Sequence, residues 1–160
     1  MPSELIKNLE NAGKLRRQSA GLEQVEALLR EAIADLLEAK KIIHLAERAT
    51  YIMAYNAILK AGRALLLIKG YRPVDGAQHK TIVELTSEFL GKPYQDLTDH
   101  FEFMRRKRHE VTYEAGFLLS KSETQKAFVS AQQLVKGILS DVKKKNPQLE
   151  LSFEKNFEKV

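Results

Sequence analysis

The chain has 160 residues, of which 44% are hydrophobic and 29% charged, and this composition is typical of a single soluble domain with an apolar core. It lacks cysteine, which excludes disulfides and thiolate metal sites, and no apolar run approaches the roughly 20 residues that a membrane-spanning helix needs. The N-terminus carries acidic residues early and has no hydrophobic signal core, so we expect a cytoplasmic protein. The net charge of +5 permits polyanion binding without requiring it.

Three helices are predicted in the first half of the chain, because apolar residues recur there at intervals of three and four. They are a short helix over residues 5–9 with Ser3 as its cap, a long amphipathic helix over 22–43, and a third helix over 51–69. The third helix is apolar around most of its circumference, which predicts a central position. The stretches RRQSAG and GYRPVDG are expected to form a connection and a loop.

The second half of the chain continues the helical pattern. It predicts a helix over residues 80–90, another over 94–113, and a long last helix that ends at residue 145, before an Asn-Pro pair. Two capping boxes match the start of the last helix, Ser120 with Glu123 or Ser122 with Gln125.

The tail after the last helix has a different pattern. Leu149, Leu151 and Phe153 alternate weakly, so a short strand, a docked arm and disorder all stay open for it. The sequence therefore predicts an all-α, up-down bundle of about five to six helices over residues 1–146, followed by a C-terminal tail over 147–160.

The segment FMRRKRHEVTYEAG contains five consecutive basic residues, from Arg105 to His109. At about 100° per residue, one stripe of this helix is formed by apolar residues at steps of four and three: Leu97, Phe101, Met104, Val111 and Leu118. Arg108 occupies the one position of this stripe where a hydrophobic residue is expected, whereas Arg106 and Lys107 project to the flanks. Arg108 is therefore the unusual member of the run.

Three interpretations of Arg108 stay open, because a buried guanidinium needs a partner. It can form a salt bridge with an acid on the second helix, such as Asp35 or Glu38. It can bind a phosphate bidentately at a dimer interface, or its stem can cover the core while its charge reaches solvent. For Arg105, Arg106 and Lys107, a solvated charged face competes with non-specific contact to RNA phosphates.

Several segments together resemble one family, the HEPN domains. The similarity lies in YIMAYNAILKAGRALLLIKGYRP, in HKTIVEL and in RHEVTYE, and it extends over residues 5–113. The resemblance implies an up-down helical bundle that dimerises. Many members of this family are toxins of toxin–antitoxin pairs that act as metal-independent ribonucleases, through an arginine followed after four to six residues by histidine. Their antitoxin is commonly a small nucleotidyltransferase, and other members are inactive binding modules.

The sequence departs from that catalytic pattern. The fifth position after Arg108 is Tyr113 rather than histidine, and His109 lies only four positions after Arg105, one short of the family spacing. The chain resembles a branch that has tyrosine at this place. A tyrosine hydroxyl is a poor base near neutral pH, although it can donate a proton or bind phosphate. The candidate catalytic residues are thus Arg108, Tyr113 and His109.

The candidates for RNA binding are Arg105, Arg106, Lys107, Asn56 and Arg63. Asn56 and Arg63 lie on one line of the third helix, and in the resemblance this line faces the arginine motif; a hydrogen bond within the core is the alternative for Asn56. The four histidines show no zinc spacing and no phosphate loop is present, so we expect neither a metal nor a cofactor.

Two functions follow as expectations. The chain is either a metal-independent ribonuclease toxin, in which the 2′-hydroxyl of RNA is the nucleophile, or a non-catalytic module that pairs with a nucleotidyltransferase. In both cases we expect a homodimer.

Overall fold

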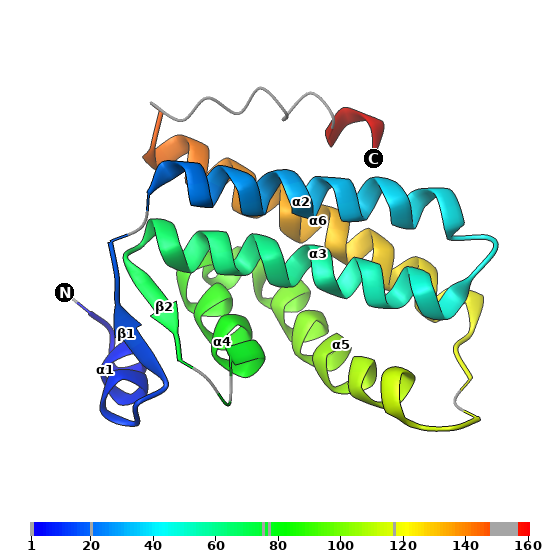
Figure 1. The fold of residues 1–160 in the computed structure, drawn as a ribbon, viewed down its shortest axis with the longest axis horizontal. Helices are drawn as coiled ribbons and strands as arrows, with labels where there is room; N and C mark the ends of the chain where they lie inside the picture. The colour runs from blue at the N-terminus through cyan, green and yellow to red at the C-terminus, as the bar shows by residue number, and fades with distance from the viewer. Residues whose placement is uncertain (1, 20, 75, 77, 117, 148–156) are drawn as a thin grey trace.

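The computed structural model describes all residues except 1, 20, 75, 77, 117 and 148–156, and it contains six α-helices in the described part of the chain (Figure 1). These are α1 (Glu4–Asn11), α2 (Leu22–Ile42), α3 (Glu47–Ile68), α4 (Gln78–Leu90), α5 (Gln95–Tyr113) and α6 (Lys121–Lys145). A 3₁₀ turn, η1 (Lys92–Tyr94), links α4 to α5. The predicted all-α bundle is confirmed.

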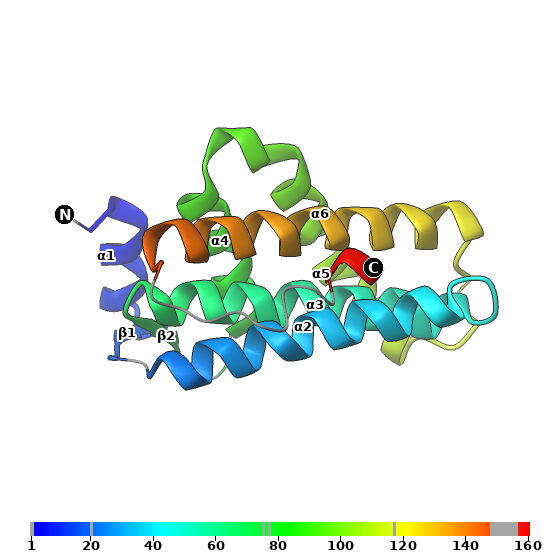
Figure 2. The same ribbon diagram turned by 90° about the horizontal axis from the view of Figure 1, so that it is seen from above.

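The third helix is the centre of the bundle, as its apolar circumference predicts. Helices α2 and α6 run along one side of α3, and α4 and α5 pack on the other side (Figures 1 and 2). By length and composition α3 could cross a membrane, but 67% of its most apolar window is buried inside the protein. Helix α3 is therefore apolar around its circumference because other helices cover it on all sides. Tyr51 and Tyr55, both on α3, are fully enclosed.

A small β-ribbon was missed by the sequence patterns. Residues Leu15–Arg17 form β1, which pairs antiparallel with β2 (Tyr71–Pro73), where we expected a connection and a loop. Strands of three residues are too short to show an alternating pattern, and these two are brought together only when α2 and α3 fold back on each other. The ribbon fixes α1 beside the link between α3 and α4.

The helix ends mostly follow the expected signals. The Ser3 side chain accepts a hydrogen bond from the Ile6 backbone at 3.3 Å, and Ser120 accepts one from the Glu123 backbone at 3.0 Å. Ser120 rather than Ser122 is therefore the cap of α6. Helix α5 ends at Tyr113, so Leu118, which we assigned to its apolar stripe, lies beyond the helix and is exposed.

A glycine sets the distance between α3 and α4. A Cβ atom on Gly62 would lie 2.7 Å from Ile82 Cγ2 and 2.9 Å from Thr86 Oγ1, closer than side chains pack. The missing side chain lets α4 approach α3 closely, with Ile82 and Thr86 packed against the middle of α3.

Of the tail, the structure describes Pro147 and residues 157–160. Phe157 and Val160 pack against the core, and the Lys40 ammonium donates to the Lys159 carbonyl at 2.6 Å. These residues agree with the docked-arm interpretation. The weak alternation at 149, 151 and 153 lies outside the described residues, and the division of the chain at residue 146 stays a prediction.

Candidate functional site

The basic run on α5 divides into three groups with different surroundings. Arg105 donates through Nε to Glu102 at 2.9 Å, and Arg106, whose side chain is 75% exposed, donates to the same carboxylate at 3.2 Å. Lys107 lies on the opposite flank, 2.9 Å from Glu123 of α6. Arg108 turns toward the bundle. The run is therefore not one surface patch, which agrees with the helical geometry of the sequence.

Arg108 lies where α3, α4 and α5 meet. Its guanidinium carbon is 5.9 Å from the centroid of the Tyr55 ring on α3. The Tyr55 hydroxyl, in turn, shares a hydrogen bond of 2.9 Å with Nδ1 of His79, in the first turn of α4; which group donates depends on the histidine tautomer. The packing of three helices thus assembles a tyrosine, a histidine and an arginine that are far apart in the sequence.

The Arg108 guanidinium contains a buried nitrogen, Nε, that makes no hydrogen bond to any described residue. A salt bridge with the second helix, one of the three interpretations of Arg108, is absent from the described part of the chain, and Asp35 pairs with Lys60 at 2.9 Å. A buried donor without an acceptor is unfavourable, so this nitrogen lowers the stability of the fold and does not contribute to it.

Positive charges converge on His79. Partial burial lowers the pKa of His79 below its ordinary value of 6.5, and the charges of Arg108, Arg63 and Arg105 lower it further. His79 is therefore neutral at neutral pH. Burial raises the pKa of Tyr55, an effect that Arg108 and Arg105 only partly oppose, so its hydroxyl stays protonated. We call Arg63, Arg105 and Arg108 the arginine cluster.

Arg63 joins this cluster from α3, where its Nη2 donates to Gln78 Oε1 at 3.0 Å. Asn56, on the same line of α3, is half-buried, and its side chain has no hydrogen-bond partner among the described residues. The hydrogen bond within the core that we considered for Asn56 is therefore not formed by the described part of the chain. Of Asn56 and Arg63, only Arg63 is connected to the surroundings of His79, through its hydrogen bond to Gln78.

His109 and Tyr113 form a separate pair on the solvent side of α5. Their ring centroids lie 4.9 Å apart at an angle of 50°, and Tyr113 is 67% exposed. Within one chain, the structure thus brings together His109 and Tyr113 but not Arg108. The residues that do surround Arg108, Tyr55 and His79, were not among our candidates. No local signal marks them, because their proximity arises from helix packing.

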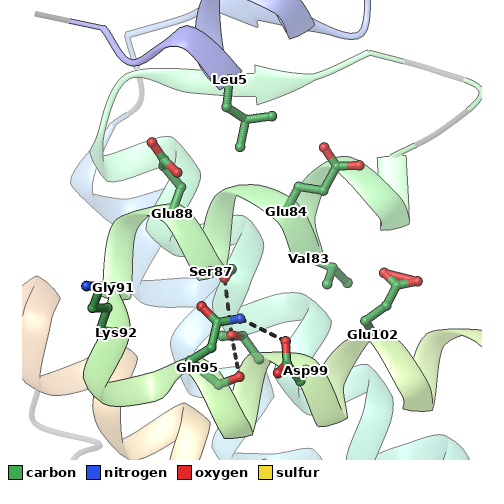
Figure 3. A pocket seen from close by; sticks show the side chains of 11 residues that line it. Leu5, Val83, Glu84, Ser87, Glu88, Gly91, Lys92, Gln95, Asp99 and Glu102 are labelled. Atoms are coloured by element: carbon green, nitrogen blue, oxygen red, sulfur yellow. Dashed lines mark hydrogen bonds between the residues drawn. The ribbon is translucent and has the colours of Figure 1, made fainter.

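An acidic cleft borders the arginine cluster. It has a volume of about 490 Å³ and lies between α4 and α5, with Leu5 of α1 above it (Figure 3). Its acidic side chains are Glu84, Glu88, Asp99 and Glu102. Burial raises the pKa of Glu102, but hydrogen bonds and charge from Arg105 and Arg106 outweigh this effect and lower it. The acidic side chains of the cleft repel phosphate, so an anion is favoured only on the arginine side of Glu102.

No group of three or more metal-ligating side chains occurs in the described ranges.

Comparison with known protein families gives a match over most of the chain. The family model described as HEPN domain matches residues 25–143, well over half of the chain. The matched region leaves out α1 and β1 and includes nearly all of α6, whereas the similarity seen in the sequence ended at Tyr113. A search of curated proteins finds no match.

Proposed function

The chain belongs to the HEPN domain family, and on this premise we propose that it binds RNA by holding a phosphate at the arginine cluster. The observation that carries the proposal is that Arg108, a partly exposed arginine with no acidic partner among the described residues, lies beside a histidine on which the charges of three arginines act. Arginine binds phosphate oxygens through paired N–H donors, and such charge-assisted hydrogen bonds are stronger than neutral ones.

The neighbours of Arg108 supply further contacts to a bound phosphate. The Tyr55–His79 hydrogen bond fixes the histidine ring, so that Nε2 becomes the free nitrogen of His79. When the Tyr55 hydroxyl donates to Nδ1, Nε2 carries a proton and can donate to a phosphate oxygen. Phosphate binding then neutralises the arginine charges that depress the pKa of His79, so binding and the protonation of His79 reinforce each other.

RNA cleavage is a second function that this site can support. The 2′-hydroxyl would attack the phosphorus and the 5′-oxygen would leave, which yields a 2′,3′-cyclic phosphate without a metal ion. The step needs a base for the 2′-hydroxyl proton and an acid for the leaving oxygen. Neutral His79 is suited to the first role in its other tautomer, with Nε2 unprotonated. The His109–Tyr113 pair could act as the acid only from a second subunit, since Arg108 is turned away from it within one chain.

The separation of Arg108 from His109 and Tyr113 favours the alternative, a non-catalytic binding module. In this form the arginine cluster holds RNA while a partner protein carries out the chemistry, and we propose a small nucleotidyltransferase as that partner.

We also propose that the chain forms a homodimer. Exposed apolar side chains support it, namely Leu45 between α2 and α3, Tyr113 at the end of α5 and Leu118 between α5 and α6. The α2–α3 link and the end of α5 lie at the same end of the bundle (Figure 1). Sedimentation of the purified chain tests the dimer, and Leu118→Ser should shift it toward monomer.

Fluorescence anisotropy with a labelled single-stranded RNA in EDTA tests the binding proposal. Arg108→Ala should weaken binding about tenfold or more, as expected for loss of a charge-assisted hydrogen bond. Arg17→Ala is the matched control, because it removes the same charge from an arginine that is 65% exposed on β1, away from α5. Equal weakening by both variants would mean that binding is non-specific electrostatics and would overturn the proposal.

The same samples decide between the two functions. Products that end in a 2′,3′-cyclic phosphate, formed by the unaltered chain and not by Arg108→Ala or His79→Gln, identify a ribonuclease. Intact RNA under conditions of saturated binding identifies the non-catalytic module.

A further inference from the structure

A second hollow of the molecule lies on the other flank of α5, between α3, α5 and α6. It has a volume of about 350 Å³ and is lined by Tyr51, His100, Phe103, Lys107, Glu123 and Lys126. This volume is at the lower end of the range of small-molecule sites, roughly 300–1000 Å³. None of its side chains belongs to the arginine cluster.

Tyr51 gives this cavity an unused hydrogen-bonding group. The residue is only 1% exposed, and its hydroxyl is buried without a hydrogen-bond partner in the described part of the chain. Burial raises the pKa of Tyr51, and the negative charges of Glu123 and Glu110 raise it further, so the hydroxyl keeps its proton. Buried tyrosine hydroxyls normally have a partner, so the hydroxyl of Tyr51 is a donor that the described residues leave unused beside the cavity.

Phe103 provides an aromatic surface at the same cavity. It is 52% exposed although it is a large apolar residue. The His100 ring stacks beside it, with centroids 5.9 Å apart and planes at 26°, and the Lys107 ammonium lies 5.7 Å from its centroid. His100 is itself held by a hydrogen bond of 2.6 Å between Nδ1 and Ser130 Oγ. The ring of Phe103 is thus supported on its flanks.

The charges around the cavity suit a ligand with an aromatic body and an anionic group. Lys107 and Lys126 line it together with one acid, Glu123, which is already 2.9 Å from Lys107. Lys126 is exposed and has no acidic partner among the described residues. Partial burial, followed by the charge of Lys126, lowers the pKa of His100, so this histidine is neutral and adds no charge.

We propose that this cavity is a nucleobase subsite, in which a base stacks on Phe103 and its edge hydrogen-bonds to the Tyr51 hydroxyl. Lys126 then pairs with the phosphate of the same nucleotide. The inference rests on the proposed RNA binding and specifies its substrate as single-stranded, since a base within a duplex cannot leave its stack to reach an aromatic side chain at low cost.

The cavity and the arginine cluster lie on opposite flanks of α5. Phe103 and Arg108 are five positions apart on the helix, which separates their directions by about 140°. The exposed ridge between them carries Arg106, His109 and Tyr113. An RNA strand that crosses this ridge would contact both sites.

Mononucleotides test the subsite separately from RNA binding. In ¹⁵N-labelled protein, nucleoside 5′-monophosphates should shift the amide signals of His100, Phe103 and Lys126, whereas ribose 5-phosphate, which has no base, should not. Phe103→Leu keeps an exposed apolar side chain and should weaken mononucleotide binding about fivefold or more, the lower end for loss of base stacking. Tyr51→Phe should weaken it about two- to tenfold, as expected for one hydrogen bond.

Each other outcome has a distinct meaning. Equal shifts from ribose 5-phosphate, or an unchanged affinity in Phe103→Leu, would overturn the base subsite while leaving the arginine cluster as a phosphate site. Shifts of these amides that depend on protein concentration and not on nucleotide would identify the cavity as a self-association surface and overturn it as well. Mononucleotide binding that persists in a chain without affinity for longer RNA would retain the subsite and refute the proposed function.

Discussion

Replacing Arg108 by methionine should make the protein more stable and less able to bind RNA. Methionine has a similar length, carries no charge, and continues the apolar stripe of Phe101, Met104 and Val111, all of which are buried. A structural arginine would give the opposite change in stability, so this one substitution separates a binding role from a packing role.

The magnitude follows from the surroundings of Arg108. A buried donor without an acceptor costs about 1–3 kcal/mol, and the Arg108 Nε is such a donor. The contact between the guanidinium and the Tyr55 ring offsets about 0.5–1 kcal/mol of this, because Arg108 is partly exposed. The net expectation is a stabilisation of about 1 kcal/mol, which in a chain of this size raises the Tm by roughly 2–4 °C.

Urea and thermal denaturation, followed by far-UV circular dichroism, measure this change. Arg106→Met is the matched control and should alter the free energy of unfolding by less than about 0.5 kcal/mol, since Arg106 is 75% exposed. If Arg108→Met lowers stability by more than about 1 kcal/mol, the guanidinium is a structural element and the reasoning from its unsatisfied nitrogen is wrong.

Four further predictions concern the packing of α4, the cap of α6 and the titration of His79. Gly62→Ala should destabilise the protein by about 1–3 kcal/mol in urea denaturation, because the new methyl group would overlap α4; an unchanged midpoint would contradict the close packing. Ser120→Ala should cost about 1 kcal/mol and Ser122→Ala almost nothing, since only the first caps α6. The depressed pKa of His79 contributes stability that is complete above pH 6.5 and is lost as the pH falls below it, so His79→Gln should flatten that loss. In NMR titrations, phosphate should raise the pKa of His79 and leave that of His100 unchanged; no change at His79 would argue against anion binding there.

Local patterns in the sequence account for most of the helices. The periodicity of α2 and α6, the Ser3 cap and the Asn-Pro stop after α6 depend on residues within a few positions of one another. The start of α3 was predicted four residues late, because its first turn has few apolar residues to mark it. The choice between Ser120 and Ser122 needed the structure, since both fit the same short pattern.

The sequence by itself determined that the chain is a helical bundle and that Arg108 is anomalous, because helical period and apolar stripe are properties of one segment. Only the tertiary structure decided what Arg108 faces. Tyr55 and His79 come from two other helices, and they meet Arg108 because Gly62 lets α4 approach α3. It also decided that His109 and Tyr113 point to solvent and that Tyr51 lacks a partner. Contacts of this kind depend on how helices pack, and helix packing leaves no periodic signal in any single segment.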